Sequence, residues 1–212
     1  MNQNTLIGIV AVISLAVGLW LAATISPSAE PPKYVQLYPE PRALAPVEIT
    51  DHQGNQITNE WFKDQWTLTF MGYTFCPDIC PTTLAELKQL YPQLQSIEAE
   101  HPVKVLFLSV DPNRDTQERL NEYINFFHSD FVAATAEHKA LFPLVRSMGM
   151  AYAIAESTDK PDYLVDHSAS VVVVNPNGHV MGRFKPEHKP GEMPISDGEQ
   201  IMHDLPLLAA AF

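Results

Sequence analysis

Two cysteines four residues apart are the most reactive feature of this sequence. Cys76 and Cys80 are its only cysteines, and both lie in residues 73–81, YTFCPDICP. A pair of this kind can be a structural disulfide, a redox couple or a clamp for a soft metal ion. The chemistry of the protein therefore depends on which of these three uses applies.

The pair lies between a predicted strand and a predicted helix. Residues 66–73 are rich in aromatic and β-favouring side chains, which predicts a strand. Apolar residues recur with a helical period over residues 82–100, and Pro81, which has no N–H, suits a first helical position. A helix N-terminus lowers the pKa of a nearby thiol because of its free N–H groups and partial positive charge. We expect the cysteines to straddle the turn and the first helical coil, where both can face one ion.

This spacing leaves a metal site and a reversible disulfide both open. The pair has one residue more than the Cys-x-x-Cys of redox proteins, yet two sulfurs need only approach to about 2.0 Å to form a disulfide. Two thiolates favour Cu(I) and then zinc, but a structural zinc site requires four protein ligands. Copper(I) accepts two or three ligands, so one imidazole would complete such a site. A permanent disulfide over so short a loop would stabilise the fold only weakly, and we rank it last.

His167 is the histidine whose surroundings differ from those of the others. It lies at a turn that leads into an apolar strand. From the residues alone, His167 is either a buried or capping residue or the third ligand of a metal site. Polar, charged surroundings typical of the protein surface are found for four other histidines: His101, His128, His138 and His188.

The rest of the chain alternates strands and helices. Turns are predicted at residues 51–54 and at the Asn-Pro-Asn-Gly of residues 175–178. Further strands are predicted at residues 46–50, 103–110, 170–175 and 179–184, and further helices at 115–127, 137–148 and 196–210. This order predicts an α/β, thioredoxin-like fold, which keeps its active site just after the first central strand.

The N-terminal region predicts a membrane anchor followed by a tether. Thr5 to Ile25 contains no charged residue, and 21 helical residues span about 30 Å, the thickness of a bilayer core. In residues 26–46, six of the 21 residues are proline, which favours an extended tether. The predicted organisation is an anchor (1–25), a tether (26–46) and a domain (47–212). No basic residue precedes the anchor, so charge does not indicate its orientation. The cysteine pair favours the oxidising side of the membrane. We therefore predict a single-pass protein of the bacterial inner membrane with its soluble domain in the periplasm.

Composition limits the class of partner. The 212 residues are 46% hydrophobic and 18% charged, as expected of a globular protein. Thirteen basic and 25 acidic residues give a formal charge of −12. Nucleic acid is excluded as a partner, because no basic surface would offset phosphate repulsion.

Three segments together resemble one protein family. Residues 74–84 (TFCPDICPTTL), 109–116 (SVDPNRDT) and 165–170 (VDHSAS) closely resemble the Sco/SenC family, and the resemblance covers roughly Val47 to Phe184. Members of that family are membrane-anchored, thioredoxin-like copper proteins that serve the assembly of cytochrome c oxidase. The resemblance implies that Cys76, Cys80 and His167 bind one copper ion per chain.

The resemblance leaves two functions open. The first is a copper chaperone that delivers the ion to the dinuclear copper site of the copper-bearing subunit of cytochrome c oxidase. The second is a thiol–disulfide oxidoreductase that uses a Cys76–Cys80 redox disulfide to reduce the copper-site cysteines of that subunit. A periplasmic copper donor or a thiol reductant would be a further partner. A peroxidase of this fold is disfavoured, because Tyr73 stands where a Thr or Ser would be expected.

Residues around the three donors have simpler predicted roles. Asp166 could orient the imidazole of His167, although neighbours in a strand point apart. Asp115 or Thr116 is expected to cap a helix. Turns or caps are expected for Asp78 and Asp111, and core or rim positions for Met71, Met148, Met150 and Met181.

Overall fold

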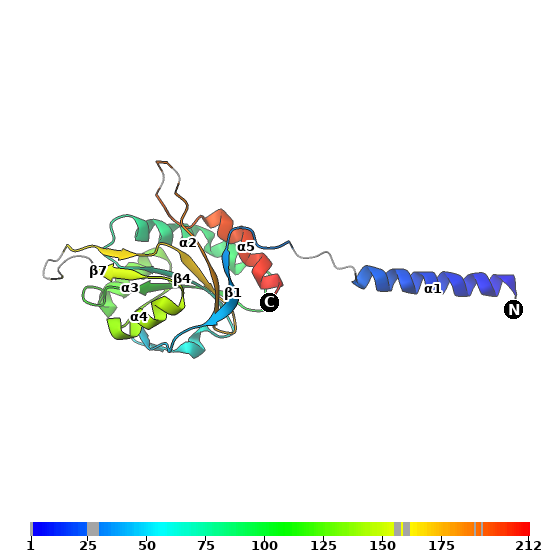
Figure 1. Ribbon diagram of the computed structural model, residues 1–212, viewed down its shortest axis with the longest axis horizontal. Coiled ribbons are helices and arrows are strands. Elements are labelled where there is room, and N and C mark those ends of the chain that lie inside the picture. Colours follow the sequence, from blue (N-terminus) through cyan, green and yellow to red (C-terminus); the bar gives the residue numbers. More distant parts are fainter. Residues whose placement is uncertain (1, 25–29, 155–157, 159–161, 189, 192) are drawn as a thin grey trace. The chain divides into compact units, whose positions relative to one another are not determined.

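The computed structural model divides the chain into two compact units and describes all residues except 1, 25–29, 155–157, 159–161, 189 and 192 (Figure 1). The first unit, residues 1–31, contains helix α1 (Gln3–Thr24). Its segment Gln3–Leu21 is long and apolar enough to cross a membrane by length and composition, and none of it is buried in the protein. The predicted apolar span thus coincides with one helix, apart from Ile25, which lies outside the described residues.

The second unit, residues 32–212, contains the remaining helices and strands. Its helices are α2 (Ile79–Gln95), α3 (Gln117–Phe127), α4 (His138–Ser147), α5 (Gly198–Ala210) and the short 3-10 helix η1 (Asn59–Phe62). Its strands are β1 (Gln36–Ala43), β2 (Ile49–Asp51), β3 (Gln56–Ile57), β4 (Trp66–Gly72), β5 (Val103–Ser109), β6 (Val132–Thr135), β7 (Tyr152–Ile154), β8 (Val165–His167), β9 (Val171–Val174) and β10 (His179–Phe184).

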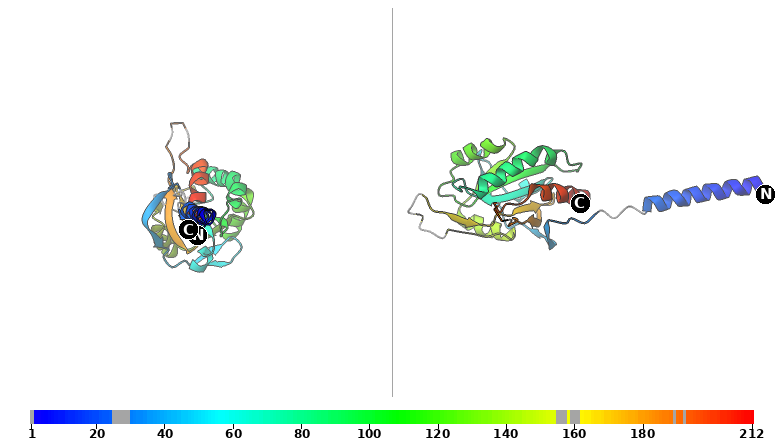
Figure 2. Two further views of the ribbon diagram at one scale, coloured as in Figure 1. Left: turned by 90° about the vertical axis from the view of Figure 1, so that its right-hand side faces the viewer. Right: turned by 90° about the horizontal axis from the view of Figure 1, so that it is seen from above.

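The strands form one large mixed sheet and one small ribbon. The order in the main sheet is β1-β10-β9-β4-β5-β6-β2-β3. Strands β4, β5 and β6 are parallel, whereas β9 runs antiparallel to β4. Strands β7 and β8 pair antiparallel with each other as a separate ribbon, which lies to one side of the main sheet (Figure 2). This is the thioredoxin-like α/β arrangement that the sequence predicted.

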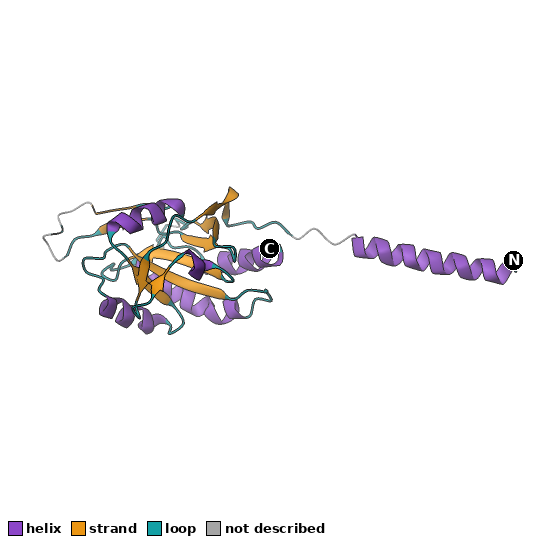
Figure 3. Ribbon diagram, turned by 90° about the horizontal axis from the view of Figure 1, so that it is seen from below, coloured by secondary structure: helices purple, strands orange, loops and turns teal. Residues whose placement is uncertain are grey.

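Helices enclose the sheet on both faces (Figure 3). Helices α2, α3 and α5 pack on the face to which Leu68 and Phe70 of β4 point. Helix α4, η1 and the β7–β8 ribbon pack on the opposite face, with Met71. Successive side chains of a strand point to opposite faces, so β4, buried along its whole length, contributes to both cores.

The predicted tether ends earlier than residue 46. Residues 36–43 form β1, an edge strand paired antiparallel with β10, and the compact domain begins at Pro32 rather than Val47. The prolines of this segment suggested an extended tether, but prolines are tolerated at sheet edges and at irregularities of pairing. Pro39 and Pro41 lie at such a place, because the β1–β10 register shifts between Leu37 and Arg42.

Most other predicted elements are confirmed, with shifted ends. The Asn-Pro-Asn-Gly turn joins β9 and β10, and the turn of residues 51–54 joins β2 and β3. Helix α2 begins at Ile79 and ends at Gln95, whereas residues 82–100 were expected. Pro81 is its third residue rather than its first, which costs no hydrogen bond because the first-turn N–H groups have no helical partner. Helix α5 continues through Pro206.

Gly182 allows the close approach of β1 to β10. A Cβ atom at this position would lie 2.4 Å from the carbonyl oxygen of Gln36 and 2.8 Å from Cα of Leu37. Gly182→Ala should therefore displace β1 and lower the free energy of unfolding by about 1–3 kcal/mol, the usual cost of overpacking. Urea denaturation of the detergent-solubilised chain, followed by circular dichroism, measures this change. An unchanged midpoint would contradict the packing of β1 on the domain.

Candidate metal centre

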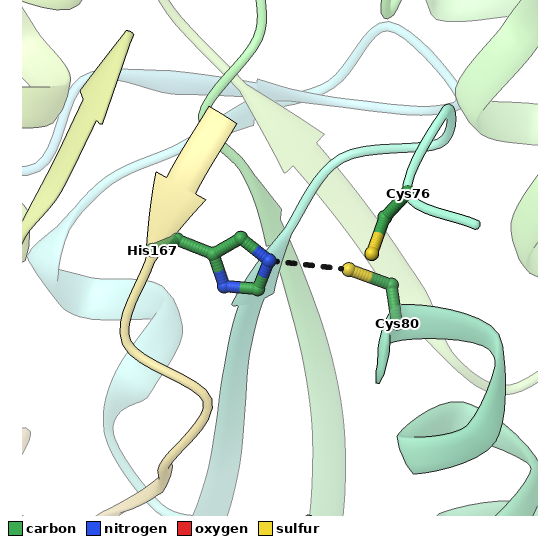
Figure 4. A group of neighbouring side chains, drawn as sticks. All are labelled: Cys76, Cys80 and His167. Carbon is green, nitrogen blue, oxygen red and sulfur yellow. Dashed lines mark hydrogen bonds between the residues drawn. The ribbon is translucent and has the colours of Figure 1, made fainter. Parts of the chain in front are cut away.

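The three predicted donors come from three different elements and meet at the end of β4. Cys76 lies in the loop between β4 and α2, Cys80 is the second residue of α2, and His167 is the last residue of β8. Figure 4 shows the imidazole of His167 pointing toward the two sulfurs. The donors come from opposite faces of the sheet, because α2, which carries Cys80, covers one face and the ribbon, which carries His167, covers the other.

The donor atoms are close enough to hold one ion. The two Sγ atoms and a ring nitrogen of His167 all lie within 4.8 Å of one another. Cys80 Sγ is 3.5 Å from His167 Nε2, and both cysteines are free thiols. Cys80 is fully buried and Cys76 is partly exposed, so an incoming molecule reaches Cys76 first.

A buried carboxylate fastens the loop that carries Cys76. Asp115 accepts hydrogen bonds from Thr74 N at 3.0 Å, from Thr74 Oγ1 at 2.7 Å and from Ser109 Oγ at 2.5 Å. Burial raises the pKa of Asp115, and these bonds oppose the increase. The sequence suggested Asp115 or Thr116 as a helix cap. Thr116 caps α3 by accepting from Arg119 N, whereas Asp115 ties the thiol loop to β5.

Aromatic rings and a glycine shape the space around the donors. The His167 ring meets those of Tyr73 and Phe70 edge-to-face, with centroids 5.9 and 6.3 Å apart. Gly72, the last residue of β4, leaves room for Cys80, because a Cβ atom there would lie 2.5 Å from its sulfur. Sequence reasoning missed Gly72, although a glycine that ends a buried strand is a recognised sign of a close approach.

The two thiols behave as one coupled acid. The pKa of Cys76 is lowered to about 4, and the largest cause is a hydrogen bond from Cys80. Burial opposes this shift, whereas hydrogen bonds with His167 and from the N–H groups of Cys80 and Asp78 lower the pKa further. The same hydrogen bond and burial raise the pKa of Cys80. The pair therefore loses its first proton from Cys76. Phe75 offers no charge to Cys76, and the low pKa comes from the helix start and the second thiol instead.

A backbone carbonyl orients the imidazole of His167. Nδ1 is 3.3 Å from the carbonyl oxygen of Ser168, which can only accept, so Nδ1 carries the hydrogen in this contact. Nε2 lies on the side of the two sulfurs, 3.5 Å from Cys80 Sγ, the position that a metal ligand needs. Asp166, considered as the orienting group, is exposed on the strand and points away from this contact.

The remaining predicted residues lie beside the site or in the core. Asp78 precedes α2 as its N-cap residue without a side-chain capping bond. Asp111 is fully buried and bonds Arg114 and Tyr163, so its role is larger than the predicted turn. The four methionines are core or rim residues as predicted, with Met71, Met148 and Met150 buried and Met181 packed against the core.

Comparisons with known proteins agree with this geometry. The fold and site define a thioredoxin-like protein whose thiol pair and histidine converge at the end of the central strand. The chain belongs to the SCO1/SenC family, whose model matches residues 36–201.

Individual relatives match most of this chain. The SCO2-like protein of Rickettsia conorii is 29% identical over 199 residues, 90% of this chain and 95% of that protein. The human mitochondrial protein SCO1 homolog is 29% identical over 157 residues, 74% of this chain but only 52% of the human protein. The crystal structure of Arabidopsis thaliana ScoI with copper bound is 26% identical, with a TM-score of 0.69 over 80% of this chain and 99% of that one.

The low pKa of Cys76 predicts its reactivity toward alkylation. Its thiolate should persist down to about pH 4, whereas an ordinary cysteine, with a pKa near 8.5, loses about tenfold in rate per pH unit below that value. In reduced, metal-free protein, iodoacetamide should modify Cys76 at nearly constant rate from pH 8 to pH 5. Peptide mass spectrometry measures each site, with urea-unfolded protein as control. A tenfold loss per unit over this range would contradict the assigned pKa.

Substitution of Gly72 tests the space reserved for Cys80. Gly72→Ala places a Cβ atom 2.5 Å from Cys80 Sγ and 2.9 Å from the Phe107 ring, so it should lower the free energy of unfolding by about 1–3 kcal/mol. Cys80→Ala in the same chain removes the nearer clash and should recover part of the loss. Urea denaturation of the two single variants and the double variant completes the cycle. Additive losses would show that the sulfur does not occupy this space.

Proposed function

We propose that the chain binds one copper ion on Cys76, Cys80 and His167 and delivers it to the dinuclear copper site of cytochrome c oxidase. The observation that carries this proposal is the convergence of two thiols and an imidazole within 4.8 Å. The copper ion is cargo, held by the chain and handed to another protein.

The donor set fits copper better than the alternatives. Two thiolate sulfurs and one imidazole nitrogen are soft and borderline ligands, which suit Cu(I). Structural zinc sites take four protein ligands, and three His, Cys, Asp or Glu donors converge here among the described residues. Cys76 already carries a negative charge at neutral pH, so an arriving cation displaces only the proton of Cys80.

Relatives support the choice of ion and recipient. The Arabidopsis thaliana ScoI structure has copper bound. The resemblance of residues 74–84, 109–116 and 165–170 to the Sco/SenC family connects the site to oxidase assembly and to the copper-bearing subunit as recipient. The membrane anchor is assigned to α1, which would keep the domain in the periplasm, near a membrane-bound oxidase and a periplasmic copper donor or thiol reductant.

A thiol–disulfide oxidoreductase is the second function that a specific observation favours. Cys76 is the more exposed thiol and has the lowered pKa, so it can attack a disulfide of the recipient subunit. Cys80 would then resolve the mixed disulfide. The pair gives two electrons and the proton of Cys80 to the recipient cysteines, which take their second proton from water, and it becomes a Cys76–Cys80 disulfide. This reaction and copper binding therefore exclude each other in one molecule.

Removal of the imidazole separates the two functions. His167→Ala should weaken copper binding by about 10- to 100-fold or more, since loss of even an outer-shell partner costs that much. The variant should still form the Cys76–Cys80 disulfide. Competitive titration with a Cu(I) chelator, with copper counted by mass spectrometry, gives stoichiometry and affinity. His101→Ala is the matched control, because His101 packs against Phe212, which in turn packs on Trp66 at the start of β4, whereas the donors lie at its end. Equal affinity with and without His167 would refute the ligand assignment.

The reductase function has its own test. Metal-free dithiol protein is mixed with an oxidised peptide that carries the recipient's pair of copper-site cysteines, together with an excess of a small dithiol donor. Repeated turnover by the wild-type protein, together with its loss in the Cys76→Ser variant, supports catalysis. A single stoichiometric exchange without turnover supports delivery of copper as the working function.

A further inference from the structure

Arg114 lies between the two segments that carry the donors. It belongs to the loop between β5 and α3, and its guanidinium carbon is 3.5 Å from the ring centre of Tyr163 and 4.9 Å from that of Phe75. Phe75 directly precedes Cys76, and Tyr163 precedes His167 by four residues. One planar cation therefore contacts the thiol loop and the segment leading to the histidine.

Asp111 holds this cation in place. Arg114 Nε donates to Asp111 Oδ2 at 2.5 Å, and the hydroxyl of Tyr163 donates to Asp111 Oδ1 at 2.5 Å. Asp111 is fully buried, and bonds to a buried carboxylate are strong and directional. Asp111, Arg114 and Tyr163 thus form a closed triangle. The guanidinium of Arg114 lies on the ring of Tyr163, and both residues donate hydrogen bonds to the carboxylate of Asp111. A flat guanidinium suits this arrangement, and an ammonium group does not.

His167 needs such a connection because of the topology. Strand β8 pairs with β7 and stands outside the main sheet, so no main-sheet ladder sets its distance from the thiols. A two-stranded ribbon alone is marginally stable. Side-chain contacts must therefore fix the ribbon, and the Tyr163 stack lies on the side that faces the thiol loop.

We propose that Arg114 is a positioning residue, which joins the thiol loop to the histidine ribbon and sets the separation between His167 Nε2 and the two sulfurs. This inference rests on the proposed copper site and deepens it. In this role Arg114 acts through Phe75 and Tyr163. In this arrangement His167 Nε2 lies 3.5 Å from Cys80 Sγ.

Arg114→Lys tests the role of the planar group, because it keeps a positive charge beside Asp111 and loses the flat face. In the metal-free full chain in detergent, the ring resonances of His167 should shift and broaden in nuclear magnetic resonance spectra. Affinity for Cu(I) should fall by about tenfold, the lower end for outer-shell partners. In a His167→Ala background the same substitution should cause no further loss, because the ligand that it positions is gone.

Arg119→Lys is the matched control. Arg119 also lies over Phe75, at 5.2 Å, and bonds Thr74, so it contacts the thiol side alone in these interactions. Its substitution should leave the His167 resonances unchanged. If Arg114→Lys does not fold, Tyr163→Leu removes the stack from the histidine side and should shift the same resonances.

The outcomes separate this inference from the proposed function. Unchanged His167 resonances and unchanged affinity in Arg114→Lys would overturn the positioning role. An equal loss of affinity with and without His167 would also overturn it, since Arg114 would then act through the thiols or the fold in general. A wild-type chain that binds no Cu(I) would instead refute the proposed function, while the resonances of the metal-free protein would still report on Arg114.

Discussion

The parallel pairing of β4 with β5 determines where the metal centre can form. The two strands run in register from Trp66 beside Val103 to Gly72 beside Ser109 and end at the same edge of the sheet. The loops that leave this edge, one with Cys76 and one with Asp115, must therefore lie side by side. Their hydrogen bonds through Thr74 turn that proximity into a fixed geometry. Carboxyl ends of parallel strands are the usual place for sites in open α/β sheets, and this chain follows the rule.

The interaction between the two thiols bears on both proposed functions, copper delivery and thiol reduction. The lowered pKa of Cys76 favours its thiolate, which suits both a metal ligand and a nucleophile. Formation of the disulfide removes two of the three donors, so the oxidised protein cannot hold the ion in the same way. Copper binding in turn occupies both sulfurs. The redox state of the pair thus decides which chemistry is available.

The third donor differs from the thiols in how it is held. Cys76 and Cys80 belong to the junction of β4 and α2, inside the main fold, whereas His167 ends a ribbon that pairs only with itself among the described strands. Movement of the ribbon would break side-chain contacts and leave the main-sheet ladders intact. The Asp111–Arg114–Tyr163 triangle lies across this boundary. In the proposed copper site, the main fold would hold the two thiols, and a few side-chain contacts would hold the imidazole.

Sequence patterns predicted the elements whose periodicity is strong. The central strands, the cysteine turn, the hairpin of residues 175–178 and the main helices all follow from local rules of burial and turn chemistry. Strand β1 was missed because its prolines resemble a tether, and β7 and β8 because three-residue strands carry no period. Asp115 was taken for a cap, since its partners Thr74 and Ser109 are distant or unremarkable in the sequence.

Residue chemistry and spacing along the chain were enough to predict the donor types, the N-terminal apolar helix and the α/β class. Through its motifs the sequence also indicated His167, which no local pattern could distinguish from a buried histidine. Folding brings this imidazole, 87 residues beyond Cys80, to a distance of 3.5 Å from the Cys80 sulfur. That distance depends on a ribbon, a glycine and a buried salt bridge, and contacts between distant segments leave no periodic trace in the sequence.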